Sequence, residues 1–251
     1  MDASFNNRLD AEPRPRLMES NLTGCIVVVS PHLDDAVLSL GAAMARRAGQ
    51  GEDWTVVTVF AGDPDSTAPA SPYDRRCGFR SAGEAATVRR REDKRACYIL
   101  GAKPVWLPFG DVQYDRFRDA DTVWALLGPH VSQAQVLLLP GFPLTHRDHA
   151  WVTNLVLGRA PENTPIGFYA EQPYARSVRS ASGRHGFIAG RAVRWVSLRG
   201  SIAERLTKGR ACRAYRSQFR ALGCHLPRRC LLPEVFWTDE HLGWPEAGPL
   251  K

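Results

Sequence analysis

The feature that most constrains the fold is an unbroken run of apolar β-forming residues, Cys25-Ile26-Val27-Val28-Val29, followed at once by polar residues and then by an alanine-rich segment. A strand that is apolar on both faces is typical of the centre of a parallel sheet that helices cover on both sides. The segment of residues 35–47 predicts a helix that ends near Gly49. The sequence therefore predicts an α/β fold that begins with a buried strand joined to a helix.

The rest of the chain continues this alternation of strands and helices. Further strands are predicted at residues 54–61, 103–107, 135–139, 166–170 and 194–198, and further helices at 84–100, from 122 onward, at 150–157 and at 202–222. The alternation predicts a Rossmann-like, doubly wound, mostly parallel sheet with helices on both faces. Residues 62–83, which are rich in Pro, Ser, Asp and Gly, are expected to form a long loop that borders the functional site. The chain after Pro227 is expected to be irregular.

The length of 251 residues and the hydrophobic content of 44% favour a single domain, which we expect over residues 23–251. Residues 1–22 are polar and are expected to be a flexible tail. No apolar run approaches the ~20 residues of a transmembrane helix, so we expect no membrane span and a cytoplasmic location. The net charge of +7 is spread along the chain without a nucleic-acid-binding motif, so nucleic acid is not an expected partner.

The six cysteines contain no C-x-x-C pair, so the sequence predicts neither a zinc ribbon nor a redox motif. Free thiols are the simplest expectation. A bridge between Cys224 and Cys230 is left open.

Two motifs rich in His and Asp follow predicted strands. The first is Pro31-His32-Leu33-Asp34-Asp35 and the second is His146-Arg147-Asp148-His149. In each motif, two side chains that can bind a metal are three residues apart at a helix start, so they share one face of the first turn. Histidine and carboxylate side chains are the ligands of catalytic zinc, which keeps one position for water. Because strand ends of a parallel sheet meet at one edge, the motifs predict a metal site with acid and base groups beside it.

Two other interpretations compete with a metal site. Asp34 and Asp35 alone are also what the N-terminus of a helix prefers. A second class of function is a non-catalytic α/β protein that binds nucleotides or polyanions. Against it, the first strand-to-helix turn has no G-x-G-x-x-G and no P-loop, and it places carboxylates where phosphates would need glycines.

The two motifs resemble those of the LmbE-like, or PIG-L, family of zinc-dependent N-deacetylases. The opening family signature, of the type His-Pro-Asp-Asp-Glu, is similar to residues 31–36, and the later His-x-Asp-His motif is complete at residues 146–149. The likeness extends over most of residues 25–237. It includes Arg89-Arg90-Arg91-Glu92, residues 169–174 and Tyr215-Arg216-Ser217-Gln218.

The chain departs from the family signature at Leu33, where proline is usual, and at Ala36, where glutamate is usual. Neither position supplies a metal ligand in the family assignment, so the metal site is expected to survive. Ala36 removes a charge next to the site, and Arg147 is expected to place a positive charge at its mouth.

The resemblance implies a reaction in which water directly attacks an N-acetyl or longer N-acyl group on an amino sugar or its conjugate. The implied partner is thus a small molecule, and the setting is the biosynthesis of secondary metabolites, in which many relatives act. A homo-oligomer is left open. The implied roles are metal ligands for zinc or another divalent cation (His32, Asp35, His149), a general base (Asp34), a group that polarises the amide (His146), a group that orients an imidazole (Asp148) and substrate contacts (Arg89, Asp111).

Overall fold

Strands and helices alternate along most of the part of the chain that the structure describes. The computed structural model describes residues 25–48, 52–115, 118–174, 185–188, 191–198, 200–222 and 234–239. In chain order the elements are β1 (Cys25–Ser30), α1 (Asp35–Ala48), β2 (Asp53–Thr58), α2 (Pro72–Cys77), α3 (Ala82–Leu100), β3 (Ala102–Trp106), α4 (Ala120–Ser132), β4 (Val136–Phe142), α5 (Arg147–Leu157), β5 (Ile166–Ala170), β6 (His185–Ile188), β7 (Arg191–Leu198), α6 (Ile202–Cys212), α7 (Arg216–Leu222) and β8 (Glu234–Asp239).

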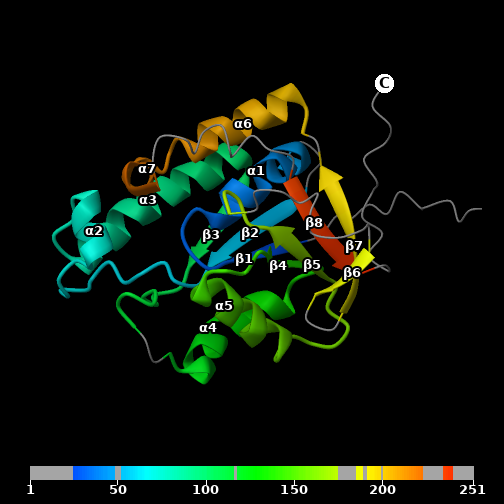
Figure 1. The fold of residues 1–251 in the computed structure, drawn as a ribbon, viewed down its shortest axis with the longest axis horizontal. Coiled ribbons are helices and arrows are strands. Elements are labelled where there is room, and N and C mark those ends of the chain that lie inside the picture. The colour runs from blue at the N-terminus through cyan, green and yellow to red at the C-terminus, as the bar shows by residue number, and fades with distance from the viewer. Residues whose placement is uncertain are drawn as a thin grey trace, which may run out of the picture.

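The described strands form one sheet in the order β3-β2-β1-β4-β5-β8-β7-β6 (Figure 1). Strands β3, β2, β1, β4 and β5 are parallel, whereas β8, β7 and β6 are joined to them by antiparallel pairing. From β1 the chain winds outward to β3, and it then returns to the other side of β1 as β4. A ligand crevice is expected at this reversal, outside the carboxyl ends of β1 and β4. The expected doubly wound sheet is confirmed, and the antiparallel extension adds to it.

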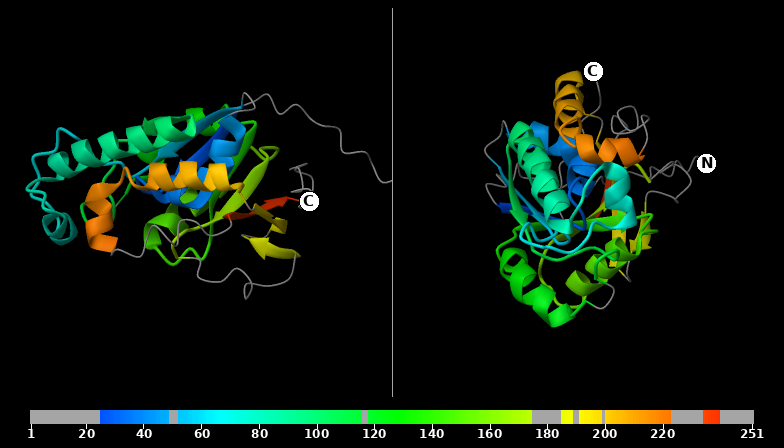
Figure 2. Two further views of the ribbon diagram at one scale, coloured as in Figure 1. Left: turned by 90° about the horizontal axis from the view of Figure 1, so that it is seen from above. Right: turned by 90° about the vertical axis from the view of Figure 1, so that its left-hand side faces the viewer.

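Helices cover both faces of the sheet. Helices α1, α3 and α6 contact one another over one face, and α4 and α5 lie over the other (Figures 1 and 2). Neighbouring residues of a strand point to opposite faces. Val28 accordingly packs in the core under α1, α3 and α6, and Val29 packs in the core under α4 and α5, with both side chains fully buried. The apolar β1 is therefore explained by burial on both of its faces.

Residues 62–83 are more ordered than the sequence predicts, because α2 lies within them and α3 begins at Ala82. The side chain of Ser71 accepts a hydrogen bond from the Asp74 backbone N–H, and Pro72 occupies the first turn. Gly78 ends α2 in the left-handed conformation, with φ of 97°. A helix this short has too few residues to show periodicity, so the expectation of a loop without helix is wrong here.

The predicted helix over residues 202–222 is two helices, α6 and α7, with a break at residues 213–215. Tyr215 is buried at the break, and its hydroxyl donates to Asp93 Oδ1 at 2.7 Å. This hydrogen bond links the break between α6 and α7 to the neighbouring helix α3.

The expectation of an irregular chain after Pro227 is wrong for β8, which pairs with β5 and β7. This strand is only Glu234–Asp239, and its partner β7 is close in space but not in sequence. Its register is therefore set by tertiary pairing rather than by a local turn.

Three other expectations are not tested by the structure. The predicted tail at residues 1–22 and the open Cys224–Cys230 bridge lie outside the described residues, and the single domain over residues 23–251 stays a prediction. Among the described residues, Cys25, Cys77 and Cys97 are free thiols. The described helices include none with the length and apolarity needed to cross a membrane.

Candidate active site

The site lies where three neighbouring parallel strands end. His32 follows β1, and Asp35 is the first residue of α1. His146 caps the N-terminus of α5 after β4, so His149 lies in the first turn of that helix. Glu171 directly follows β5. The strand order therefore brings the two sequence motifs, which are more than a hundred residues apart, to one edge of the sheet.

Three ligand atoms from these motifs form a nearly equilateral triangle. His32 Nδ1 and His149 Nε2 are 3.2 Å apart. Asp35 Oδ2 lies 3.2 Å from His149 Nε2 and 3.3 Å from His32 Nδ1. Two ligands of a tetrahedral zinc ion, each 2.0–2.1 Å from the metal, are about 3.3 Å apart. The three side chains thus have the spacing and the N, N, O donor set of a catalytic zinc site.

A second grouping replaces Asp35 with His146. Ligand atoms of His32, His146 and His149 all lie within 4.8 Å of one another. The triangle that includes Asp35 has shorter edges, so it fits one small cation more closely. His146 is adjacent to this triangle.

Each histidine of the triangle is held by a carboxylate at its other ring nitrogen. His32 Nε2 lies 2.9 Å from Asp148 Oδ2, and His149 Nδ1 lies 2.5 Å from Glu171 Oε1. Asp148, His149 and Glu171 are almost completely buried. Such contacts fix the ring orientation of metal-binding histidines and make the facing nitrogen a better ligand. The family resemblance implies an orienting role for Asp148 but none for Glu171, although Glu171 also follows a buried strand.

Arg118 is a further residue of the site that the sequence analysis misses. Its Nη1 lies 2.7 Å from Asp148 Oδ1, and its side chain is only 8% exposed. The guanidinium stacks over the ring of Phe60 at 3.9 Å and faces Trp151 at 5.7 Å. Arg118 belongs to no motif and precedes α4 in an irregular segment, so no local signal marks it. Arg118, Asp148 and His32 form a chain of ionic contacts that ends at the metal triangle.

The electrostatics of the triangle favour a positive charge. Burial acts to lower the pKa of His32, but contacts with Asp148 and Asp35 raise this pKa to about 9. Burial acts likewise on His149, whose pKa is raised to about 10 by Asp35 and Glu171. Burial acts to raise the pKa of Asp35, but His149 and His32 hold it well below its ordinary value. Carboxylates thus attract positive charge to this point, which a divalent cation can supply.

Asp34 lies beside the triangle but has a different environment from Asp35. Burial, followed by the charge of Asp35, raises the pKa of Asp34 well above its ordinary value. Its backbone has φ of 135°, a conformation that costs a non-glycine residue about 1–3 kcal/mol. Gln218 Nε2 of α7 donates to the preceding carbonyl, Leu33 O, at 2.6 Å. The fold therefore holds Asp34 in a strained backbone conformation at the cavity. The hydrogen bond from Gln218 fixes the peptide unit that joins Leu33 to Asp34.

His146 is the most exposed of the three histidines, with 41% of its side chain accessible. Its Nδ1 accepts the backbone N–H of Asp148 at 3.3 Å. Burial and the neighbouring charges of His32 and His149 lower the pKa of His146 below its ordinary value. A neutral ring that accepts at Nδ1 carries its proton on Nε2, so His146 can donate a hydrogen bond.

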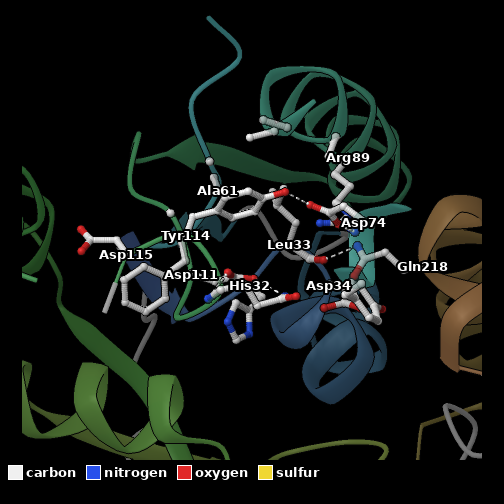
Figure 3. Close-up of a pocket in the computed structure, with 18 of the residues that line it drawn as sticks. His32, Leu33, Asp34, Ala61, Asp74, Arg89, Asp111, Tyr114, Asp115 and Gln218 are labelled. Carbon is white, nitrogen blue, oxygen red and sulfur yellow. Dashed lines mark hydrogen bonds and ion pairs between the residues drawn. The ribbon is translucent and has the colours of Figure 1, made fainter. Parts of the chain in front are cut away.

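A cavity of about 560 Å³ opens over these residues (Figure 3). His32, Asp34, Asp35 and His146 line it. Residues of the segment 62–83 form part of its wall, as the sequence analysis expects. A volume of this size accommodates a sugar with a substituent rather than an acetate ion alone.

Arg89 and Asp111 also line the cavity, but other groups of the protein contact them. The guanidinium of Arg89 pairs with the buried carboxylate of Asp74. Burial acts to lower the pKa of Arg89, but the charge of Asp74 raises it above its ordinary value. Asp111 accepts the backbone N–H of Gln113 at 2.8 Å and its side-chain amide at 3.0 Å. The structure brings both predicted substrate contacts to the cavity.

The two departures from the family signature do not disturb the site. Leu33 and Ala36 are both buried, with exposures of 4% and 1%. Ala36, in the first turn of α1, packs into the core between this helix and the sheet, and its backbone N–H donates to Ser30 Oγ at 3.2 Å. Arg147 is exposed at the first turn of α5.

The fold and the site together define an α/β enzyme with a cluster of His and Asp side chains, able to hold a metal ion, at the switch point of its sheet. The sequence model of the PIG-L family, described as GlcNAc-PI de-N-acetylase, matches residues 27–159, which is more than half of the chain. The chain belongs to the PIG-L family, and it is an N-deacetylase. The predicted family is confirmed.

Similar proteins include three deacetylases. The 2'-N-acetylparomamine deacetylase of Streptomyces fradiae is 30% identical over 199 residues, which are 68% of this chain and 68% of that protein. The structure of the A40926 pseudoaglycone deacetylase is similar with a TM-score of 0.69 and 27% identity, over 85% of this chain and 96% of that one. A deacetylase of the teicoplanin biosynthesis pathway has a TM-score of 0.70 at 23% identity, over 85% of this chain and 97% of that one. This last likeness supports the fold.

Proposed function

We propose that this protein removes the N-acetyl group, or a longer N-acyl group, from an amino sugar or its conjugate with the help of a divalent metal ion, which we expect to be zinc. The observation that carries the proposal is the triangle of His32 Nδ1, Asp35 Oδ2 and His149 Nε2, with edges of 3.2–3.3 Å. These three residues would hold the ion. When bound, zinc supplies a Lewis acid that makes water acidic enough to be a nucleophile near neutral pH.

Asp34 is the proposed general base. It lies next to the ligand Asp35, lines the cavity, and has a pKa well above its ordinary value because of burial and the charge of Asp35. A carboxylate with a raised pKa is a stronger base toward water. Asp34 therefore takes the proton from the attacking water as the new carbon–oxygen bond forms.

His146 is the proposed donor to the amide. Its Nε2 carries a proton while its Nδ1 accepts the Asp148 backbone N–H, so the ring is oriented by the start of α5. A hydrogen bond from Nε2 stabilises the negative charge that develops on the amide oxygen in the transition state. The proton that Asp34 has taken from water is then available for the leaving amine.

Asp148 and Glu171 are proposed to orient the two histidine ligands. Asp148 contacts His32 Nε2, and Glu171 contacts His149 Nδ1. Neither carboxylate supplies one of the three ligand atoms, so each acts on the site through the imidazole that it contacts. Arg118 holds Asp148 in its turn.

Arg89 and Asp111 are proposed to contact the part of the substrate beyond the acyl group. Both line the cavity that also contains Asp34 and His146. The relatives named as deacetylases of 2'-N-acetylparomamine and of the A40926 pseudoaglycone support an amino-sugar conjugate as substrate and antibiotic biosynthesis as setting.

A non-catalytic nucleotide-binding role is not favoured by the strand-to-helix turn after β1. This turn contains Asp34 and Asp35 and no glycine, whereas phosphate binding at such a turn uses backbone N–H groups that glycines leave accessible.

The predicted cytoplasmic location is tested by cell fractionation. The oligomeric state, which the sequence leaves open, is tested by light scattering of the purified protein.

The function is tested by elemental analysis and by acetate release from N-acetylated amino sugars. We expect one equivalent of a divalent metal per chain, loss of turnover on chelation and recovery when zinc is added back. His32→Ala should abolish both metal binding and turnover. A metal-free protein that releases acetate at the same rate as the loaded protein would contradict the mechanism.

A further inference from the structure

A buried ion pair and a tyrosine hydroxyl form one wall of the cavity, and the three residues come from three segments. Asp74 of α2 is 1% exposed, and its Oδ1 pairs with the guanidinium of Arg89 on α3. Its Oδ2 accepts the hydroxyl of Tyr114, which follows β3 (Figure 3). The Tyr114 oxygen in turn accepts the backbone N–H of Ser71 at 2.9 Å. We call Asp74, Arg89 and Tyr114 the Asp74 wall.

The Asp74 wall is held by several contacts and carries no net charge. Aromatic rings of Tyr73 and Phe79 lie 5.5 Å and 5.4 Å from the Arg89 guanidinium. These rings and Asp74 fix the guanidinium in place, because a buried Arg that is paired and stacked has little freedom to turn toward a ligand. The positive charge that Arg89 brings to the cavity is therefore cancelled by a carboxylate within the same wall.

Among the described side chains that line the outer cavity, carboxylates outnumber cations. Apart from the metal centre and the Asp74 wall, the described charged residues that line it are Asp63, Asp111, Asp115 and Arg76. Asp63 and Asp111 alone outnumber Arg76. Asp111 accepts hydrogen bonds from neutral groups of Gln113, which leave its negative charge in place. Without Asp74, the two arginines would balance these two carboxylates.

We propose that Asp74 determines substrate specificity by neutralising Arg89, so that the cavity selects an N-acylated amino sugar joined to a group that carries at least one ammonium charge. This inference rests on the proposed N-deacetylase function and narrows its substrate class. A substrate with phosphate beside the sugar finds no unpaired arginine in the Asp74 wall, and it meets the carboxylates Asp63 and Asp111. A cationic substrate meets the same two carboxylates as attractive charges.

The first test compares three substrates on the metal-loaded enzyme. All three carry an N-acetylglucosamine unit: an aminocyclitol glycoside that is cationic, the neutral methyl glycoside and the anionic 6-phosphate. We expect kcat/KM to fall in that order, by at least about tenfold between the cationic and the anionic compound at low salt. The difference should shrink when NaCl is added, because salt screens charges in an open cavity. Equal values for the cationic and neutral compounds, or a preference for phosphate, would overturn the proposal.

The second test changes the charge of the Asp74 wall. Asp74→Asn keeps the side-chain shape and leaves Arg89 unpaired, so the preference should shift toward the phosphorylated substrate by about tenfold. The double variant Asp74→Asn with Arg89→Gln is neutral again, so the preference should return toward that of the native enzyme. A purely structural role for Asp74 predicts instead that all three substrates lose activity to the same degree and that the double variant restores nothing.

Two control variants separate wall charge from other effects. Tyr114→Phe removes the hydroxyl hydrogen bond to Asp74 without changing the charge, so the order of the three substrates should stay the same. Asp53→Asn removes a carboxylate from the start of β2, where Asp53 pairs with Lys103 on the surface. Asp53→Asn changes the net charge of the protein by the same amount as Asp74→Asn, and it should leave the preference among the three substrates unchanged. A shift of this preference in either control variant would overturn the assignment to Asp74.

Failure of this inference is distinguishable from failure of the proposed function. If the metal-loaded enzyme releases acetate from all three compounds without preference, the function stands and the role of Asp74 is wrong. If it releases acetate from none, the function itself fails, and the inference fails with it. Should Asp74→Asn not fold, the native enzyme with the three substrates and the salt series still tests the predicted preference for a cationic substrate.

Discussion

The metal centre and the Asp74 wall face the same cavity, but they treat buried charge in different ways. At the centre, Asp35, Asp148 and Glu171 surround two imidazoles, which leaves an excess of negative charge that a metal cation can neutralise. In the wall, one carboxylate meets one guanidinium, and the charges cancel within the protein. Buried charges must be paired or must bind an ion, and the two regions illustrate these two solutions. The excess negative charge of the centre can bind the catalytic ion, whereas the balanced charge of the Asp74 wall affects which substrates the cavity accepts.

Among variants that keep the bound metal, the largest effect is expected for Asp34→Asn, which tests whether the adjacent residues Asp34 and Asp35 have separate roles. The amide that replaces the carboxylate has the same shape but cannot accept a proton from water, so kcat should fall on the order of a thousandfold. Metal content should be unchanged, because Asp34 is not part of the triangle. Stopped acetate-release assays and elemental analysis give both values. A loss of metal in this variant would mean that Asp34 and not Asp35 is the ligand.

His146→Gln tests which third side chain completes the metal site. A group that stabilises developing charge on the amide oxygen contributes about 10²–10³-fold to kcat, so we expect a loss of this size with KM little changed. The bound metal should remain, since Asp35 and not His146 closes the triangle. The matched variant Asp35→Asn should lose the metal. The reverse pattern would favour the wider grouping of His32, His146 and His149.

Arg118→Met tests the support of the centre from behind. Asp148 would keep its contact with His32 but lose its ion pair, so His32 would be oriented less well. Loss of such outer contacts typically weakens metal affinity about 10–100-fold. Competition with a chromophoric chelator measures this affinity without any turnover. Arg159→Met, which removes an ion pair with exposed Asp121, is the control and should leave the affinity unchanged.

The smallest effect is expected for Tyr114→Phe in the Asp74 wall. A hydrogen bond to a charged group contributes about 1.5–3 kcal/mol when buried, and the partial exposure of Tyr114 places the expected loss of stability at the low end of this range. Urea unfolding of the metal-free protein measures the change in free energy of unfolding. No change in stability would show that this hydroxyl does not hold the Asp74 wall together.

The same contrast explains how much can be predicted from the sequence. The residues of the centre belong to two short motifs, each placed by a buried strand that is recognisable from its apolar residues, so their meeting at one edge of the sheet is predictable. Glu171 has the same kind of signal, because it follows β5, but it has no second ligand beside it in the chain. The alternation of strands and helices is predictable for the same reason, since each element has its own hydrophobic pattern.

The Asp74 wall and the edge of the sheet are not predictable in this way. Asp74, Arg89 and Tyr114 lie in three segments, and their pairing depends on how the segment that contains α2 packs against α3. The sequence predicts a loop where α2 lies, because a helix of one or two turns shows no periodicity. Strand β8 likewise depends on pairing with β5 and β7, which only the folded chain brings together. Non-local contacts of this kind leave no pattern in a single sequence.

The most direct test of the metal centre is anomalous X-ray diffraction from crystals of the zinc-loaded protein, recorded at the zinc absorption edge. We expect one strong peak about 2.0–2.1 Å from each of His32 Nδ1, Asp35 Oδ2 and His149 Nε2. Asp34 and His146 should lie beside this peak without coordinating it. A peak bound by His146 in place of Asp35, or no peak among these residues at full zinc loading, would contradict the proposed metal centre.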